Sequence, residues 1–220
     1  IHLSGNTTIG KNNTFYPFST IGLPPQDKKY GGENSKLIIG DENIFREHVT
    51  INPGTESGGM ETIIKNKCLV MVGCHIAHDC IISSNVILVN NVILGGHVTI
   101  DEYAIIGGNS AIHQFVNVGK HAMIGGMSGV EMNIVPYALY FGLRSDLRGM
   151  NLIGLKRLGL DKSKIQNINF IFKKIFNKDN NLEFNISQLS HEEKNIKEIY
   201  NIIEFINLNL KRGICRLKDG

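Results

Sequence analysis

Aliphatic residues recur along this chain at every sixth position. The longest unbroken series has twelve members: Ile64, Val70, Ile76, Ile82, Leu88, Leu94, Ile100, Ile106, Ile112, Val118, Ile124 and Val130. A second row, mostly small or β-branched, lies four residues after each of these, from Cys68 to Ile134. Residues i and i−2 of a strand point to the same side, so both rows face inward. A helix would need apolar spacings of three and four, which this stretch lacks.

The same phase is present before this series, with two interruptions. The earlier members are Leu3, Ile9, Phe15, Ile21, Ile39, Phe45 and Ile51. The interruptions, residues 23–36 and 52–63, are rich in Gly and polar residues and are typical of loops extruded from a regular solenoid. Since Leu3 is already in phase, we expect the chain to begin within the solenoid.

The periodicity changes after Pro136. Apolar residues then follow helical spacing at Ile165, Ile168, Phe172 and Ile175, and again at Ile196, Ile199, Ile203, Ile206 and Leu210. Ser190 with Glu193 predicts a capping box, and Gly213 a helix C-cap. We therefore predict a solenoid over residues 1–146 and a small helical domain over residues 147–220.

Hexapeptides of this kind resemble the left-handed parallel β-helix, in which three hexads form one triangular coil of eighteen residues. Coils stack at about 4.8 Å, the spacing between paired strands. The handedness is what the resemblance implies, because the general rule for parallel crossovers predicts the other hand. The expected fold is an all-β left-handed parallel β-helix followed by a C-terminal α-helical domain.

Composition narrows the function classes. A net charge of +3 does not indicate a nucleic-acid partner, and no run of eighteen apolar residues predicts a membrane span. No signal peptide is visible at the start. Cys68, Cys74 and Cys80 occupy the small inward slot, and their spacing matches no zinc motif. We interpret these thiols, with Cys215, as reduced and packed, which favours a cytoplasmic protein.

Stacking the chain at eighteen residues per coil brings histidines together. Ile76, Leu94 and Ile112 fall on one face, and the histidines close to them in sequence are His75, His78, His97 and His113. Gly96 lies one coil from His78, and Gln114 one coil further. A neutral imidazole can take a proton from a hydroxyl near pH 7, so acid–base chemistry fits better than metal binding, for which Asp79 is the one nearby carboxylate.

The segments around these residues identify a family resemblance. His-Ile-Ala-His-Asp-Cys (75–80), Gly-His (96–97) and Ala-Ile-His-Gln-Phe (111–115) resemble the UDP-N-acetylglucosamine O-acyltransferases, which act first in lipid A synthesis. Gln-Asp-Lys-Lys-Tyr (26–30), Asn151 and Gly-Leu-Lys-Arg (154–157) extend the resemblance over essentially the whole chain. Hexads alone would be weak evidence, because many unrelated acyltransferases have them.

The resemblance implies a set of roles. His78 would be the general base that deprotonates the glucosamine 3-hydroxyl, Asp79 would orient it, and the Gly96 N–H would stabilise the oxyanion. Met123 and Gly126 match positions that limit acyl length, and the small Gly126 predicts a longer chain. Substrate would be held by Gln26, Asp27, Lys29, His75, His97, His113, Gln114, Asn151 and Arg157.

The resemblance also implies partners and departures. The donor would be a 3-hydroxyacyl-[acyl carrier protein], with no cofactor and no metal, and a homotrimer would carry the sites between subunits. Asn52 stands where the family commonly has a histidine, and Leu158 where it often has a second arginine. We expect an altered substrate contact at the first position and fewer charges for phosphate at the second.

Three other readings stay open on sequence grounds. The N-acyltransferase two steps later shares hexads and a catalytic histidine, but we expect an additional N-terminal uridine-binding domain in that enzyme. A catalytically silent solenoid is the second, and a carbonic anhydrase-like metal binder is the third.

Overall fold

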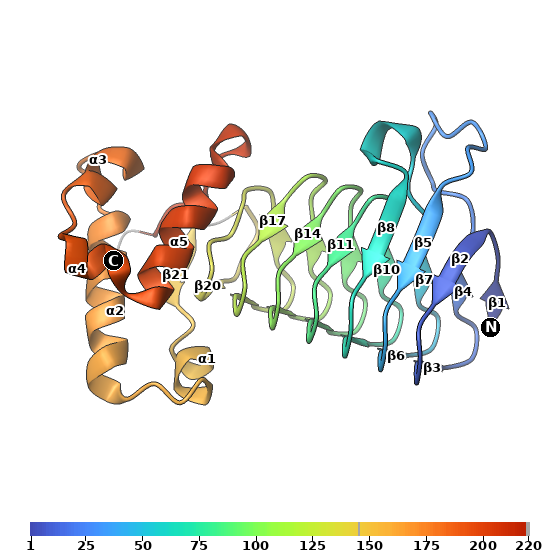
Figure 1. The fold of residues 1–220 in the computed structure, drawn as a ribbon, viewed down its shortest axis with the longest axis horizontal. Coiled ribbons are helices and arrows are strands. Elements are labelled where there is room, and N and C mark those ends of the chain that lie inside the picture. Colours follow the sequence, from blue (N-terminus) through green and yellow to red (C-terminus); the bar gives the residue numbers. More distant parts are fainter. Residues whose placement is uncertain (145, 219–220) are drawn as a thin grey trace.

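The computed structural model describes residues 1–144 and 146–218, so residue 145 and the last two residues of the expected helical domain lie outside the described residues. Its main body is a left-handed parallel β-helix, and the helices lie at one end of it (Figure 1). No helix within the described residues is both long and apolar enough to cross a membrane.

Short strands on three faces form the solenoid, and each face is one sheet whose strands are parallel, apart from the last strand of one sheet. Sheet A contains β1 (His2–Leu3), β4 (Thr20–Ile21), β7 (Thr50–Ile51), β10 (His75–Ile76), β13 (Ile93–Leu94), β16 (Ala111–Ile112) and β19 (Gly129–Val130). Sheet B contains β2 (Asn6–Ile9), β5 (Lys36–Ile39), β8 (Glu61–Ile64), β11 (Ile81–Ile82), β14 (Thr99–Ile100) and β17 (Asn117–Val118). Sheet C contains β3 (Thr14–Phe15), β6 (Ile44–Phe45), β9 (Leu69–Val70), β12 (Ile87–Leu88), β15 (Ile105–Ile106), β18 (Met123–Ile124), β20 (Ala138–Tyr140) and β21 (Leu147–Met150).

The predicted register of eighteen residues is confirmed in the uninterrupted coils. His75 pairs with Ile93, which pairs with Ala111, and the same step links Ile76 to Leu94. Every member of the twelve-residue aliphatic series is at most 2% exposed. Burying each of these side chains contributes roughly 1.5–3 kcal/mol, so the row is the main stabilising element of the solenoid.

Residues at the corners adopt the left-handed backbone conformation. At the corner between sheets A and B these are Asp79, His97 and Phe115, with φ of 59°, 61° and 64°. Asn, Asp and His tolerate this region better than most residues, because their short polar side chains can bond locally. The corner therefore stacks one side chain of each coil directly above the next.

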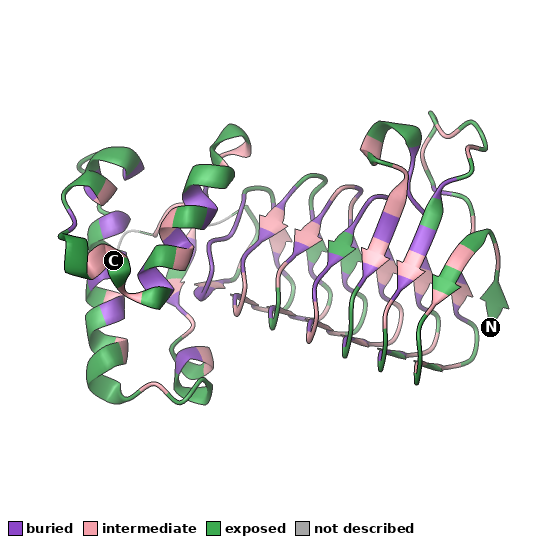
Figure 2. Ribbon diagram, in the orientation of Figure 1, coloured by how far each residue is buried: buried purple, intermediate pink, exposed green. Residues whose placement is uncertain are grey.

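The C-terminal third begins with a strand instead of a helix. β21 pairs antiparallel with β20, so it closes the last edge of sheet C, and the helices begin at Leu152. The helices are α1 (Leu152–Arg157), α2 (Lys162–Ile175), α3 (Leu182–Ser187), α4 (His191–Asn195) and α5 (Lys197–Leu208). Both α2 and α5 bury one side and expose the other (Figure 2).

Two predicted caps have different outcomes. The capping box of Ser190 and Glu193 is present at α4. Gly213, at φ 88°, ends the 3-10 helix η2 (Leu210–Arg212), whereas α5 already ends at its C-cap Asn209.

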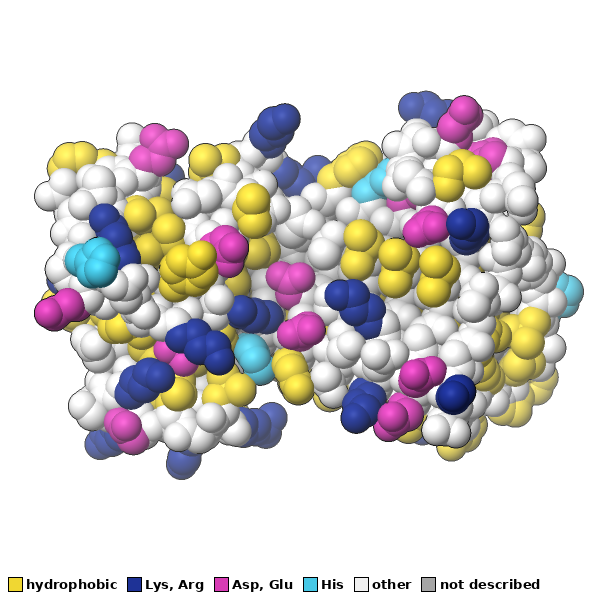
Figure 3. Space-filling view, in the orientation of Figure 1, with side chains coloured by type: hydrophobic (Ala, Val, Ile, Leu, Met, Phe, Trp, Pro, Cys, Tyr) yellow, Lys and Arg dark blue, Asp and Glu magenta, His cyan; other side chains and the backbone are white. Residues whose placement is uncertain are grey.

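Basic and acidic side chains are interspersed over the face drawn in Figure 3, in line with the small net charge.

Candidate active site

Both extruded loops leave the solenoid at the same corner. The first loop connects β4 of sheet A to β5 of sheet B, and the second connects β7 to β8 in the next coil. Figure 1 shows the two loops side by side above this edge of the helix. The second loop is shorter than expected, because β8 begins at Glu61 and the segment before it contains the 3-10 helix η1 (Glu56–Gly58). The A/B corner is therefore both the most irregular part of the solenoid and the place where the predicted histidines lie.

His78 and Asp79 form a buried pair at this corner. His78 Nδ1 lies 2.7 Å from Asp79 Oδ2, and the two residues are 8% and 6% exposed. A carboxylate can accept but not donate, so the proton of the neutral imidazole is on Nδ1. The lone pair is then on Nε2, which has no hydrogen-bond partner within the described residues. The pair therefore presents a free basic nitrogen in a fixed ring orientation.

A residue of the second loop holds the Asp79 carboxylate, and a residue of β8 holds the Asp79 backbone N–H. The Thr55 N–H donates to Oδ1 at 2.9 Å, and its hydroxyl donates to Oδ2 at 2.6 Å. The Asp79 N–H donates to the Thr62 hydroxyl at 2.8 Å. A Cβ at Gly58 would overlap the carboxylate, so the loop packs directly on it.

Gly96 gives the free nitrogen of His78 its space. A Cβ at this position would lie 2.6 Å from His78 Nε2, closer than real Cβ contacts allow. The Gly96 carbonyl accepts from Phe115, whereas its N–H meets no acceptor in the part of the chain that the structure describes. A small, unused backbone donor thus lies beside a basic nitrogen, as electrostatic stabilisation of an oxyanion would need.

His97 and His75 flank the pair. His97 lies edge-on to the His78 ring with centroids 5.0 Å apart, and it stacks on Phe115 at 4.2 Å. Burial lowers the pKa of His97, although Asp79 opposes the shift. Burial also lowers the pKa of His75, whose Nδ1 lies 2.7 Å from the Thr50 hydroxyl. Both rings are therefore neutral at pH 7, and they add polar contacts without adding charge.

His113 and Gln114 lie in the next coil and are exposed, as is Phe115 beside them. His113 Nδ1 lies 2.7 Å from Arg212 Nη2, a residue ninety-nine positions later, on η2. The C-terminal domain therefore contacts the A/B corner at His113, in the last of the three stacked coils that carry the predicted histidines.

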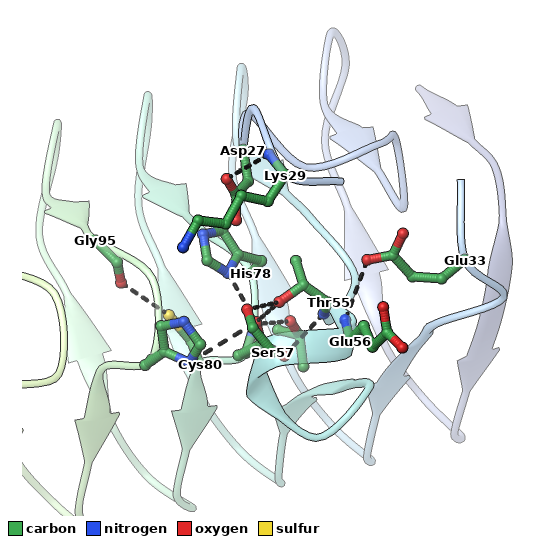
Figure 4. A network of polar contacts seen from close by, with 12 residues as sticks. Asp27, Lys29, Glu33, Thr55, Glu56, Ser57, His78, Cys80 and Gly95 are labelled. Carbon is green, nitrogen blue, oxygen red and sulfur yellow. Dashed lines mark hydrogen bonds and ion pairs between the residues drawn. The ribbon is translucent and has the colours of Figure 1, made fainter. Parts of the chain in front are cut away.

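The first loop brings its predicted residues over His78. Asp27 Oδ1 accepts from the Lys29 N–H at 2.9 Å, and the Lys29 side chain extends toward the His78 ring (Figure 4). Gln26 is exposed near them. Glu33 joins the two loops, because its carboxylate accepts from the Gly31 N–H and from the Glu56 N–H. Hydrogen bonds with backbone groups, first that of Glu33 itself and then those of Glu56 and Gly31, lower the pKa of Glu33.

Asn52 has a structural contact at the position where the family commonly has a histidine. Its amide donates to the carbonyl oxygens of Leu23 and Pro24, at 2.9 and 3.3 Å, and the residue is buried. Asn52 thus ties the start of the second loop to the start of the first.

Four predicted residues lie away from this corner. Met123 is on β18 of sheet C and Gly126 is at the next corner. Asn151 caps α1 by accepting from the Gly154 N–H, and Arg157 is the last residue of that helix. Met123, Asn151 and Arg157 line one groove of about 450 Å³ together with Leu158, Tyr103 and His121. A single chain therefore builds two separate sites, the corner and this groove.

Metal binding by the corner has one geometric argument in its favour. One ligand atom each from His78, Asp79 and His97 lies within 4.8 Å of the others. His97 Nδ1 is 3.8 Å from Asp79 Oδ2, too far for a hydrogen bond. Three such ligands would leave a coordination position open.

The buried cysteines take no part in this chemistry. Cys80 donates to the Gly95 carbonyl, and burial raises its pKa to about 12. Burial also raises the pKa of Cys68 and of Cys74 to about 11. Such thiols stay protonated and unreactive, in agreement with the interpretation of packed, free thiols.

The sequence did not point to Thr55, Thr62 or Arg212. Thr55 lies in an irregular loop where no repeat fixes the register, and Arg212 comes from the far end of the chain. The sequence carried one usable signal for Thr55, a polar loop inserted immediately before the coil that carries His78.

Comparisons with known proteins agree on one family. A family model described as Udp N-acetylglucosamine O-acyltransferase, Domain 2, matches residues 133–215. The acyl-[acyl-carrier-protein]--UDP-N-acetylglucosamine O-acyltransferases of Nautilia profundicola and Myxococcus xanthus are 44% and 43% identical, covering 94% and 96% of this chain and 79% and 82% of theirs. The structure of the Francisella novicida UDP-N-acetylglucosamine acyltransferase is 36% identical with a TM-score of 0.91, over 99% of this chain and 80% of that one. On these identities and coverages, the chain belongs to the family of UDP-N-acetylglucosamine O-acyltransferases.

Proposed function

We propose that this chain transfers a 3-hydroxyacyl group from acyl carrier protein to the glucosamine 3-hydroxyl of UDP-N-acetylglucosamine, at the start of lipid A synthesis. The relatives are named for transfer between this donor and this acceptor. The observation that carries the proposal is the free Nε2 of His78, held beside the unused N–H of Gly96.

The chemistry follows from this geometry. His78 Nε2 takes the proton of the 3-hydroxyl as its oxygen attacks the thioester carbon. The Gly96 N–H donates to the oxyanion that forms. The carbon–sulfur bond then breaks, and the imidazolium returns its proton to the carrier-protein sulfur. Asp79 remains ionised, fixes the tautomer and stabilises the imidazolium, as carboxylates do beside catalytic histidines.

Binding would use both sites. His75, His97 and the Asp27 and Lys29 pair line the approach to His78, with Gln26, His113 and Gln114 further out. Asn151 and Arg157 would hold the nucleotide, Arg157 by charge-assisted bonds to phosphate. Because that groove is on another sheet, we place it against the corner of a neighbouring subunit in a homotrimer, with Met123 and Gly126 along the acyl chain.

The proposal includes no cofactor and a cytoplasmic location. A zinc enzyme on the same corner is the second candidate, since three ligand atoms converge there. Metal analysis of the purified protein separates the two. Stoichiometric zinc, with activity lost on chelation and restored by zinc, would favour the second.

Acyl transfer to UDP-N-acetylglucosamine, with the product's acyl position assigned by NMR, tests the function. We expect an ester at the 3-position, and we expect His78→Ala to lower kcat by about 10²–10⁴-fold, the range for loss of a general base. Full activity of His78→Ala would remove it from this role.

A further inference from the structure

The second loop reaches the catalytic pair through Thr55. Two donors of this one residue bind both oxygens of Asp79, at 2.9 Å and 2.6 Å. Thr55 is 2% exposed, so water does not compete for the carboxylate. Asp79 Oδ2 accepts from the Thr55 hydroxyl and from His78 Nδ1 at the same time.

This arrangement removes the freedom that Asp79 would otherwise have. The solenoid fixes the Asp79 backbone, through φ of 59° and the bond of its N–H to Thr62. It does not fix the rotation of the carboxylate. A buried carboxylate needs hydrogen bonds, and their directions decide which way its lone pairs point. Thr55 supplies two of them, and Gly58 leaves the space that lets the loop approach.

We propose that Thr55 is a positioning residue for acyl transfer. Its hydroxyl orients Asp79 Oδ2 and thereby the ring and the tautomer of His78. The inference rests on the proposed function, because it assigns Thr55 to the same acid–base site. It gives the second loop a part in catalysis without any contact with substrate.

Thr55→Val tests the hydroxyl alone, because valine keeps the shape and the backbone bond to Oδ1. We expect kcat to fall about 10–100-fold, the equivalent of losing one hydrogen bond to a charged group, with KM changed less than about twofold. Thr55→Ser should restore most of kcat. Thr99→Val, on the outer face of β14, is the matched control and should keep kcat within about twofold.

A double-mutant cycle separates positioning from plain support of the loop, to which the 3.1 Å contact of Thr55 Oγ1 with Ser57 Oγ also contributes. If Thr55 acts through Asp79, Thr55→Val should add less than about twofold to the loss caused by Asp79→Ala. Losses that multiply would overturn the inference. If Thr55→Val fails to fold, Thr55→Ala enters the same cycle.

The wild-type chain distinguishes the two failures. An inactive wild type with folded protein would sink the proposed function. An active wild type with a fully active Thr55→Val would sink the role of Thr55 and leave the proposed function standing.

Discussion

The A/B corner and the sheet C groove differ in how far one chain completes them. At the corner, His78, Asp79 and Thr55 satisfy one another in a buried network. In the groove, Arg157 is exposed and binds no partner within the described residues. Acid–base geometry is thus built into a single chain, whereas the expected nucleotide contacts lie on helix α1, in a groove beside sheet C. Under the proposed function, we expect the corner to determine the rate and the groove to determine acceptor affinity and donor choice.

Among the variants that compare the corner with the groove, Gly96→Ala should have the largest effect. The added methyl group would push the His78 ring aside, and a displacement of about 1 Å at reacting atoms costs about 10²-fold in rate. We expect kcat to fall at least that far with every acyl donor. Gly31→Ala, whose Cβ would meet its nearest atom at 3.7 Å, is the matched control. Unchanged kcat for Gly96→Ala would place the reacting nitrogen elsewhere.

Arg157→Ala tests the groove. Loss of a charge-assisted bond to phosphate costs about 1.5–3 kcal/mol, which corresponds to about 10–100-fold in KM for UDP-N-acetylglucosamine. Initial rates over a range of acceptor concentration would measure it, and kcat should change little. A fall in kcat with an unchanged KM would mean that Arg157 acts in the chemical step at the corner and not in binding the acceptor.

In the proposed homotrimer, mixed assemblies of two variant chains would show whether corner and groove meet between subunits. Coexpression of Gly96→Ala with Arg157→Ala chains should give about a quarter of the sites an intact corner and an intact groove, because each kind comes from a different chain. Activity should then exceed that of either variant at limiting acceptor. Mixtures no better than the sum of the two variants would place both halves in one chain.

Gly126→Met should change donor choice without changing the chemistry. A longer side chain would shorten the space that we propose for the acyl chain along sheet C. The kcat/KM should therefore shift toward shorter acyl donors by about 10-fold, as expected for a few methylene groups in an apolar site. Donors of graded length would measure it. An unaltered preference would remove Gly126 from this role.

The six-residue repeat determined how much of the fold and of the candidate site could be predicted from the sequence. Wherever six-residue phase holds, register arithmetic places residues correctly, so His78, Gly96 and Gln114 fall on successive coils of one corner. Thr55 and Arg212 could not be placed, because an irregular loop and a distant helix end have no phase to count from. The strand β21 was missed because antiparallel closure of a sheet edge follows from pairing and not from periodicity.

The smallest effect concerns pH and again compares corner with groove. Burial lowers the pKa of His97 at the corner and of His121 in the groove, so both are neutral in the folded state. Between the lowered pKa and the unfolded value of about 6.5, the unfolded chain binds more protons, so stability is lost as pH falls through this window. The pKa of Glu193 is lowered by Lys174, so this residue changes stability only below pH 4.5, outside the pH window of the histidines.

Thermal unfolding from pH 7.5 to 5.5 should therefore show a falling midpoint, with a shallower slope in His97→Gln and in His121→Gln. If the slope is shallower in His121→Gln alone, His97 is already protonated at the corner, and Asp79 outweighs burial there.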